Sequence, residues 1–213
     1  GVHLFTAAGA VIGLLGFAAC SRGELRSVHI LMLLTVLIDS ADGSLARKFR
    51  VREVLPQIDG ALMDNLVDFV NYSMLPAYVL LSTDLLPANF RLPGAALVLF
   101  SSCYQFSHTN AKTTDHYFRG FPSYWNILVI YLSLSGSSPW TNSVAITTCA
   151  VMAFVPIYYV YPSRTRALRK LTLWLALPWI TLLFTAVLVS GSAELGRYSY
   201  PLTVISLFYI VYY

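Results

Sequence analysis

The sequence has very few charged residues for its length. Only 11% of its 213 residues are Asp, Glu, Lys or Arg, whereas 57% are hydrophobic. Because a soluble domain carries about a quarter of its residues as charges, this balance excludes an ordinary soluble protein and indicates a polytopic membrane protein. The chain also lacks a basic cluster interleaved with aromatic residues, so we expect no nucleic-acid partner.

Cysteine is scarce as well. The sequence holds three, Cys20, Cys103 and Cys149, an odd number without the spacing of a disulfide framework or a zinc site. We therefore expect buried thiols. Internal repeats, low-complexity segments and long linkers are also missing, so the sequence predicts one domain over residues 1–213.

Long apolar runs divide the chain into segments of membrane-spanning length, about 20 residues each. The predicted helices, some of them short or interrupted by polar groups, cover residues 2–20, 27–47, 57–82, 94–110, 122–137, 142–162, 171–190 and 199–213. We predict an all-α integral membrane protein, a single bundle of about eight transmembrane helices with a polar active site at the cytoplasmic side. Pro76, Pro156 and Pro178 lie inside apolar runs, where they predict kinks.

The basic residues are unevenly distributed between the loops. One set follows the second, fourth and sixth predicted helices and comprises Arg47, Lys48, Arg50, Arg52, Lys112, Arg119, Arg164, Arg166, Arg169 and Lys170. The alternate loops hold the others, Arg22, Arg26, Arg91 and Arg197. The positive-inside rule places the first set in the cytoplasm. Between the second and third predicted helices, residues 48–57 fit either a short segment at the depth of the lipid headgroups or a solvated loop.

Four carboxylates interrupt the second and third predicted helices near their cytoplasmic ends. Asp39 and Asp42 are three residues apart, and Asp64 and Asp68 are four apart, so each pair lies on one helical face. An ionised Asp at the centre of a lone membrane helix costs about 2.5–3.5 kcal/mol on insertion scales. Divalent cations such as Mg²⁺ prefer carboxylate oxygens, and two of them can clamp a pyrophosphate. We predict that all four bind metal.

Small residues and one arginine accompany the acids. Gly43 and Gly60 remove side chains beside the carboxylates, which lets a nucleotide approach the helices closely. Arg47 lies one turn beyond Gly43, where it can meet a phosphate or a base edge. Because of these neighbours, we predict that the metal site binds the pyrophosphate of a nucleotide.

Eight of these residues form one extended pattern: Asp39, Asp42, Gly43, Ala46 and Arg47, then Gly60, Asp64 and Asp68. The pattern resembles the signature of the CDP-alcohol phosphotransferase family, integral membrane enzymes that transfer a phosphatidyl or related group from a CDP-linked donor to an alcohol. The spacer of twelve residues between Arg47 and Gly60 is longer than most of the family uses. It resembles the bacterial phosphatidylcholine synthase branch, as do residues 54–62 and 115–126, although Ser40 replaces a glycine frequent there. The similarity covers a core of about residues 25–170.

The resemblance implies a reaction and its participants. The phosphatidyl group of CDP-diacylglycerol passes to choline and CMP leaves, in a bacterial inner membrane, with the active site facing the cytoplasm. Two ions, Mg²⁺ or Mn²⁺, are held by Asp39, Asp42, Asp64 and Asp68, and Asp68 also serves as general base. The CDP site comprises Asp42, Gly43, Ala46, Arg47 and Gly60. The resemblance also implies a homodimer.

Aromatic residues suit a choline acceptor, because each cation–π contact to a quaternary ammonium is worth about 0.5–2 kcal/mol. We predict that Tyr104, Tyr124 and Trp125 contribute to a choline site, with Asn126 as a hydrogen-bond partner. For each one, packing in the bundle is the alternative interpretation. Arg119 is predicted to contact a donor phosphate, with an ordinary cytoplasmic charge as the alternative.

Two other functions fit part of the pattern. A phosphatidylserine or phosphatidylglycerophosphate synthase would share the motif, and the latter would need a further cationic pocket for its phosphorylated acceptor. A divalent cation transporter would explain intramembrane acids, but not the glycines and the arginine at their fixed offsets. Asp59 is expected to cap the helix that follows it, and His3 is assigned no function.

Overall fold

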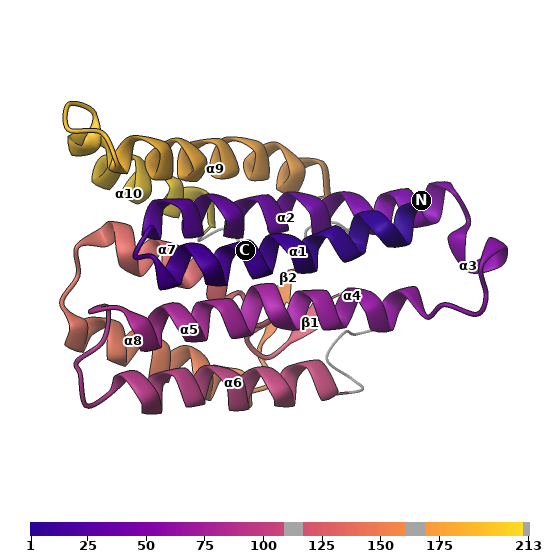
Figure 1. The fold of residues 1–213 in the computed structure, drawn as a ribbon, viewed down its shortest axis with the longest axis horizontal. Coiled ribbons are helices and arrows are strands. Elements are labelled where there is room, and N and C mark those ends of the chain that lie inside the picture. The colour runs from indigo at the N-terminus through magenta and orange to yellow at the C-terminus, as the bar shows by residue number, and fades with distance from the viewer. Residues whose placement is uncertain (109–116, 161–168, 211–213) are drawn as a thin grey trace.

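The computed structural model describes residues 1–108, 117–160 and 169–210. The first half contains α1 (Val2–Ser21), α2 (Leu25–Lys48), α3 (Val51–Val54), α4 (Gly60–Asp68), the π-helix η1 (Phe69–Met74), α5 (Leu75–Ser82) and α6 (Arg91–Ser107). The second half contains the strand β1 (Tyr117–Arg119), α7 (Trp125–Ser135), α8 (Pro139–Met152), β2 (Tyr158–Val160), α9 (Arg169–Ser190), the 3₁₀-helix η2 (Gly196–Tyr198) and α10 (Ser199–Ile210). Figure 1 shows the resulting helical bundle.

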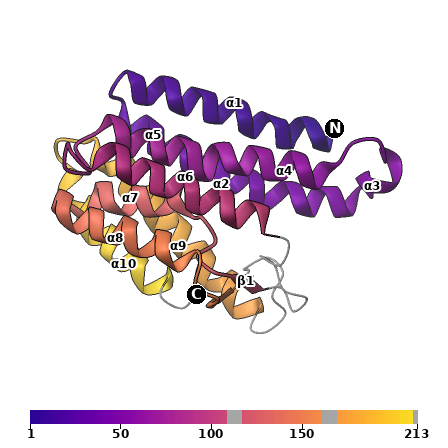
Figure 2. The ribbon, with the colours of Figure 1, turned by 90° about the horizontal axis from the view of Figure 1, so that it is seen from below.

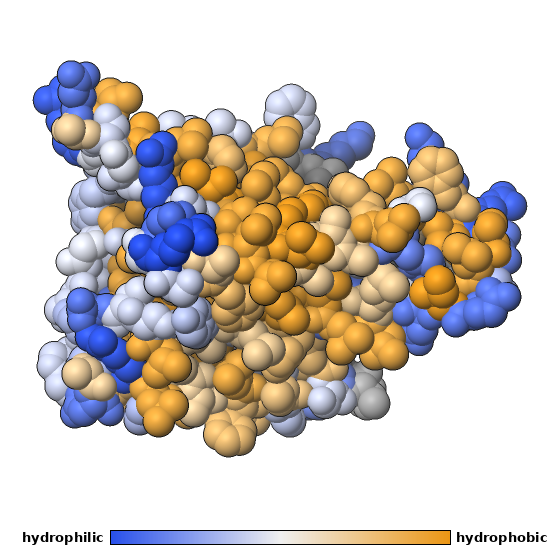
Figure 3. Space-filling view, in the orientation of Figure 1, coloured by the Kyte–Doolittle hydropathy of each residue, from blue (hydrophilic) through white to orange (hydrophobic). Residues whose placement is uncertain are grey.

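The mostly helical structure confirms the predicted class. Each of the eight predicted ranges contains helix within the described residues. Val2–Ser21, Leu25–Lys48 and Lys170–Ser190 are long and apolar enough to cross a membrane. Figure 3 shows apolar residues across the middle of one face of the molecule and polar groups concentrated toward its two ends, as expected of a protein that resides in a bilayer.

Several of the described connections between helices lie at two opposite ends of the bundle. Figure 1 shows α3 and the N-terminus at one end, with the α1–α2, α5–α6 and α7–α8 connections at the other. The cluster of Arg47, Lys48 and Arg50 therefore lies far from Arg22 and Arg91, as the alternating loop charges predict. Of the first basic set, Lys112, Arg164 and Arg166 fall outside the described residues.

The helix predicted over residues 142–162 extends too far at its C-terminal end. Helix α8 ends at Met152, and the chain then turns into β2. Pro156 has no N–H to donate and biases Val155 away from helical dihedrals, which favours a helix end before it. Strand β2 pairs antiparallel with β1, with Arg119 opposite Tyr158. This small sheet was not predicted.

A composite helix built from α4, η1 and α5 carries two of the acids. Its start confirms the predicted cap, because the Asp59 carboxylate accepts hydrogen bonds from the amides of Ala61 and Leu62, both at 3.0 Å. Pro76 offers no amide hydrogen to the carbonyl of Tyr72, four residues earlier, and such a gap favours a π-helical turn. The widened segment begins directly after Asp68.

Helix α1 packs closely along this composite helix (Figures 1 and 2). The contact needs glycine, because a Cβ on Gly13 would lie 2.5 Å from the Asn71 Oδ1. The Asn71 side-chain amide also donates to the Gly9 carbonyl at 3.0 Å. Close approach of two helix backbones, together with a hydrogen bond between the helices, is a common way for membrane helices to associate. It brings the first turns of α1 beside the start of α4.

Helix α7 lies at the centre of the bundle. Trp125, Ile130 and most of the residues between them are buried, as expected for a helix surrounded by others. The α9–α10 pair packs on α2 and α7, which leaves the ends of α2 and α4 to form the site described next.

Candidate functional site

Three of the four predicted metal ligands come together. Asp39 from α2 and Asp64 and Asp68 from α4 each offer a carboxylate oxygen, and these atoms all lie within 4.8 Å of one another. All three residues are half-buried. Like charges at this spacing repel one another. A set of ligands made only of carboxylate oxygens suits a hard divalent cation. The donor chemistry therefore fits the predicted metal.

Asp42 is not part of this group. It is 5% exposed, and its carboxyl lies within hydrogen-bond reach of the Thr6 hydroxyl on α1 and of the Gly43 backbone. The single hydrogen of this hydroxyl can go to Asp42 or to the Val2 carbonyl oxygen, which lies 3.5 Å away. The structure thus joins Asp42 to α1, a partner that the local spacing of the acids could not reveal.

Tyr72 connects the two acid-bearing helices. Its phenol donates a hydrogen bond to Asp39 Oδ2 at 2.9 Å, and the side chain is buried in η1. A hydrogen bond to an ionised acceptor fixes the carboxylate strongly. Sequence analysis assigned Tyr72 no role, although its place one turn beyond Asp68 is the signal that could have found it.

Three aromatic rings form a chain of contacts that begins at Tyr72, next to the acids. The ring of Tyr124, at the start of α7, is 6.2 Å from that of Tyr72 and 6.2 Å from that of Phe118 on β1. Tyr72 is within electrostatic range of both Asp39 and Asp68. We call Tyr72, Tyr124 and Phe118 the aromatic triad. It combines one predicted choline ligand with two residues that sequence analysis did not assign.

The other predicted choline ligands occupy different surroundings. Trp125 has no exposed surface and packs edge-on against Phe121, with ring centroids 4.9 Å apart. Asn126 is equally buried, and its Oδ1 accepts from the Ile127 amide at 2.8 Å. Tyr104 is 40% exposed and lines a separate pocket together with Arg119.

The predicted CDP residues of α2 lie along one face near the exposed end of that helix. Arg47 is exposed and bends back over Gly43, where an added Cβ would lie 3.4 Å from the Arg47 Nη1. Its Nη2 donates to the Ser44 hydroxyl at 3.1 Å. Ala46, in the turn between them, is half-buried. A guanidinium held above a glycine can meet a phosphate without obstruction by a side chain.

The second glycine of the motif contacts α1. An added Cβ on Gly60 would lie 2.9 Å from Cε1 of His3, so the imidazole fills the space that the glycine leaves. The Nε2 atom of His3 is buried, and it has no hydrogen-bond partner among the described residues. Sequence analysis gave His3 no function, because nothing local in the sequence indicates that α1 reaches Gly60.

Comparison with known proteins points to one group of enzymes. The chain is 39% identical over 172 residues to a phosphatidylcholine synthase of Borreliella burgdorferi, covering 81% of this chain and 74% of that protein. It is 45% identical over 164 residues to a phosphatidylcholine synthase of Legionella pneumophila, covering 76% and 64%. It is 32% identical over 180 residues to a phosphatidylcholine synthase of Pseudomonas aeruginosa, covering 84% and 76%. No family model matches the chain.

Proposed function

The chain belongs to the phosphatidylcholine synthase family, and we propose that it transfers the phosphatidyl group of CDP-diacylglycerol to choline with release of CMP. The observation that carries the proposal is the meeting of Asp39, Asp64 and Asp68 within 4.8 Å in a chain with these relatives. The membrane-length helices keep such an enzyme where its lipid donor resides.

The carboxylate group is proposed to hold divalent cations, two ions of Mg²⁺ or Mn²⁺. Asp39, Asp64 and Asp68 supply the oxygens, and Asp42, one turn from Asp39, is proposed as the fourth ligand. When bound, such ions neutralise the pyrophosphate of the donor and the charge that develops on the transferred phosphoryl group. Tyr72 holds Asp39 in position through its 2.9 Å hydrogen bond.

Asp68 is proposed as the general base. As the hydroxyl oxygen of choline attacks the β-phosphorus of CDP-diacylglycerol, a carboxylate oxygen of Asp68 accepts the hydroxyl proton. The new phosphorus–oxygen bond forms while the bond from that phosphorus to the bridging oxygen breaks, and CMP leaves with the bridging oxygen. A carboxylate is too weak a base to deprotonate a free alcohol beforehand, so proton transfer accompanies the attack.

The CMP part of the donor is proposed to lie along Asp42, Gly43, Ala46, Arg47 and Gly60. Arg47, exposed above Gly43, meets a phosphate. Thr6 supports this site through its contact with Asp42. His3 supports it through its contact with Gly60.

The acceptor is proposed to bind at the aromatic triad. A choline ammonium on the faces of Tyr124 and Tyr72 gains cation–π stabilisation, and its hydroxyl then extends toward the neighbouring acids. Trp125 and Asn126 act from inside the core, where their burial keeps the start of α7, and hence Tyr124, in position. This proposal moves the cation contact from Trp125 to Tyr72.

The site is proposed to face the cytoplasm of a bacterial inner membrane. The supporting observation is that the end of the bundle with α3 carries Arg47, Lys48 and Arg50, which is the cytoplasmic pattern of charge. The homodimer implied by the family resemblance stays a prediction, which cross-linking in native membranes would test.

One assay separates this function from its alternatives. The purified protein in liposomes is incubated with CDP-diacylglycerol, Mg²⁺ and labelled choline, serine or glycerol 3-phosphate. We expect labelled lipid from choline together with an equal amount of CMP. Product from serine or glycerol 3-phosphate without product from choline would overturn the acceptor, and metal flux without CMP release would favour a transporter.

A further inference from the structure

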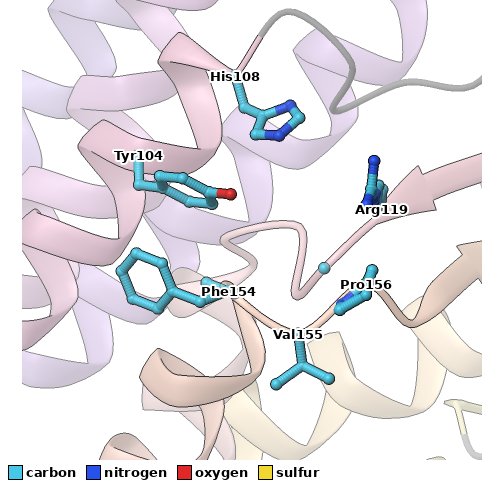
Figure 4. A pocket seen from close by; sticks show the side chains of 8 residues that line it. Tyr104, His108, Arg119, Phe154, Val155 and Pro156 are labelled. Carbon is cyan, nitrogen blue, oxygen red and sulfur yellow. The ribbon is translucent and has the colours of Figure 1, made fainter.

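A second pocket opens at the end of α6, apart from the acids. It is lined by Tyr104 and His108, by Arg119 at the end of β1 and Gly120 after it, and by residues 153–156 after α8. The hollow among them is small and opens to solvent. Figure 4 shows the Tyr104 hydroxyl directed toward the gap between His108 and Arg119, with the Phe154 ring beneath the tyrosine.

The pocket and the π-helix η1 contact different sides of α6. Phe106 packs edge-on against Phe69, with ring centroids 5.7 Å apart, and Phe69 directly follows Asp68. Tyr104 precedes Phe106 by two residues, which rotates it by about 200° around the helix. Tyr104 and the pocket therefore lie on the side of α6 turned away from Phe69.

Its walls are held by backbone contacts. The side-chain amide of Gln105 donates to the Arg119 carbonyl at 3.0 Å, and the Gly120 amide donates to the Ile157 carbonyl at 2.8 Å. Gly120 has φ +80°, and an added Cβ would lie 2.4 Å from the Ala153 carbonyl oxygen. Only glycine permits this approach, so Arg119 starts from a fixed backbone.

The pocket is lined both by aromatic rings and by a guanidinium group. The rings of Tyr104 and Phe154 lie 4.6 Å apart, and that of His108 lies 5.3 Å from Tyr104. Aromatic faces attract a quaternary ammonium, whereas a guanidinium binds phosphate. We propose that this pocket binds a phosphate ester joined to a quaternary ammonium, the headgroup of phosphatidylcholine, as a second lipid site distinct from the reaction centre.

Neither the ammonium nor the phosphate of that headgroup suits the pocket by itself. Free choline is a cation, and among the described lining residues the fixed charge is the positive Arg119, so like charges would meet. An anionic headgroup without an ammonium would leave the aromatic faces unused. The choice of this lipid rests on the proposed function, because phosphatidylcholine would be the product of the enzyme.

The surroundings suit a lipid rather than a soluble ester. Phe154 is 54% exposed, and Ile157 and Tyr158, which follow it, are 43% and 62% exposed. Exposed apolar and aromatic side chains beside a charged pocket at the end of a membrane bundle are typical of headgroup depth. The acyl chains of a bound lipid would lie against them.

The test is a binding titration of the full chain, purified in a detergent free of phosphatidylcholine. Calorimetry measures the Kd for dihexanoyl-phosphatidylcholine, dihexanoyl-phosphatidylglycerol, phosphocholine and choline. The Asp64→Asn/Asp68→Asn double variant disables the proposed reaction centre, and we expect it to keep the wild-type Kd for the phosphatidylcholine probe. Loss of transfer activity with unchanged binding separates this proposal from the proposed function.

Variants at the pocket give the decisive contrast. Phe154→Leu should raise the Kd for dihexanoyl-phosphatidylcholine about 2- to 30-fold, and Arg119→Gln about tenfold or more. Tyr198→Leu and Arg197→Gln, an exposed aromatic–guanidinium pair near the α9–α10 connection, are matched controls that should leave it unchanged. Equal affinity for the phosphatidylglycerol probe or for choline, no loss in either pocket variant, or loss in the double variant would overturn the proposal. Phosphocholine binding as tight as the lipid's would overturn the lipid as the ligand.

Discussion

The phenol of Tyr72 donates to Asp39 Oδ2 at 2.9 Å across the boundary between η1 and α2. This bond connects the helix that carries Asp64 and Asp68 with the helix that carries Asp39, and it also positions the Tyr72 ring beside Tyr124. One side chain therefore takes part in both the proposed metal site and the proposed acceptor site.

Removing the Tyr72 hydroxyl tests the first of these roles. We expect Tyr72→Phe to lower kcat about tenfold or more, because a hydrogen bond to a charged group is worth about 1.5–3 kcal/mol, while the KM for choline changes little. Steady-state kinetics with both substrates measures the split. Tyr78→Phe, on α5 of the same composite helix, is the control. A Tyr72→Phe enzyme with wild-type kcat would show that the bond does not serve catalysis.

The acceptor proposal predicts a KM effect at Tyr124. Tyr124→Leu should raise the KM for choline about 2- to 30-fold, the worth of one cation–π contact, and leave the KM for CDP-diacylglycerol unchanged. Tyr124→Phe retains the ring face and should stay near wild type. Equal changes in both KM values for Tyr124→Leu would indicate packing instead of acceptor binding.

Trp125 is expected to matter for stability and not for choline. Because the side chain is fully buried, Trp125→Ala should lower the free energy of unfolding by about 3–5 kcal/mol. Thermal unfolding in detergent measures this loss. Trp140→Ala, at a residue 63% exposed, is the control and should unfold near the wild-type temperature. A stable Trp125→Ala protein with a raised choline KM would restore Trp125 to the acceptor site.

The contact between Thr6 and Asp42 predicts a donor effect from α1. Thr6→Val keeps the shape but loses the hydroxyl, so Asp42 loses a partner and the KM for CDP-diacylglycerol should rise about tenfold. Thr6→Ser should restore it. The choline KM serves as the internal control, and an equal rise in both constants would mean that Thr6 only supports the fold.

Local spacing was enough to predict much of the site. The interval between Asp64 and Asp68 places both carboxylates in the observed group, and Asp59 caps α4 as expected from its position before the helix. The interval between Asp39 and Asp42 did not do the same, because Asp42 lies apart from that group. The apolar runs likewise located the helices, because membrane length and hydrophobicity are properties of a continuous segment.

Contacts between distant segments could not be obtained in this way. Nothing near His3 or Thr6 indicates that α1 lies against Gly60 and Asp42, because that contact depends on packing of α1 along η1 through Gly13. Strands β1 and β2 have only three residues each, too few for an alternating pattern to distinguish them from a helix end. The sequence analysis therefore predicted no role for Phe118 of the aromatic triad.

The central claim is that Asp39, Asp64 and Asp68 act as one catalytic centre for phosphatidyl transfer. The most direct test measures Mg²⁺-dependent conversion of CDP-diacylglycerol and labelled choline by Asp39→Asn, Asp64→Asn and Asp68→Asn, with Glu53→Gln, an exposed acid on α3, as the control. We predict that each Asp variant loses about a thousandfold or more of the rate, that chelation silences the wild type, and that Glu53→Gln keeps full activity. Near-normal transfer by any of the three Asp variants would contradict the account.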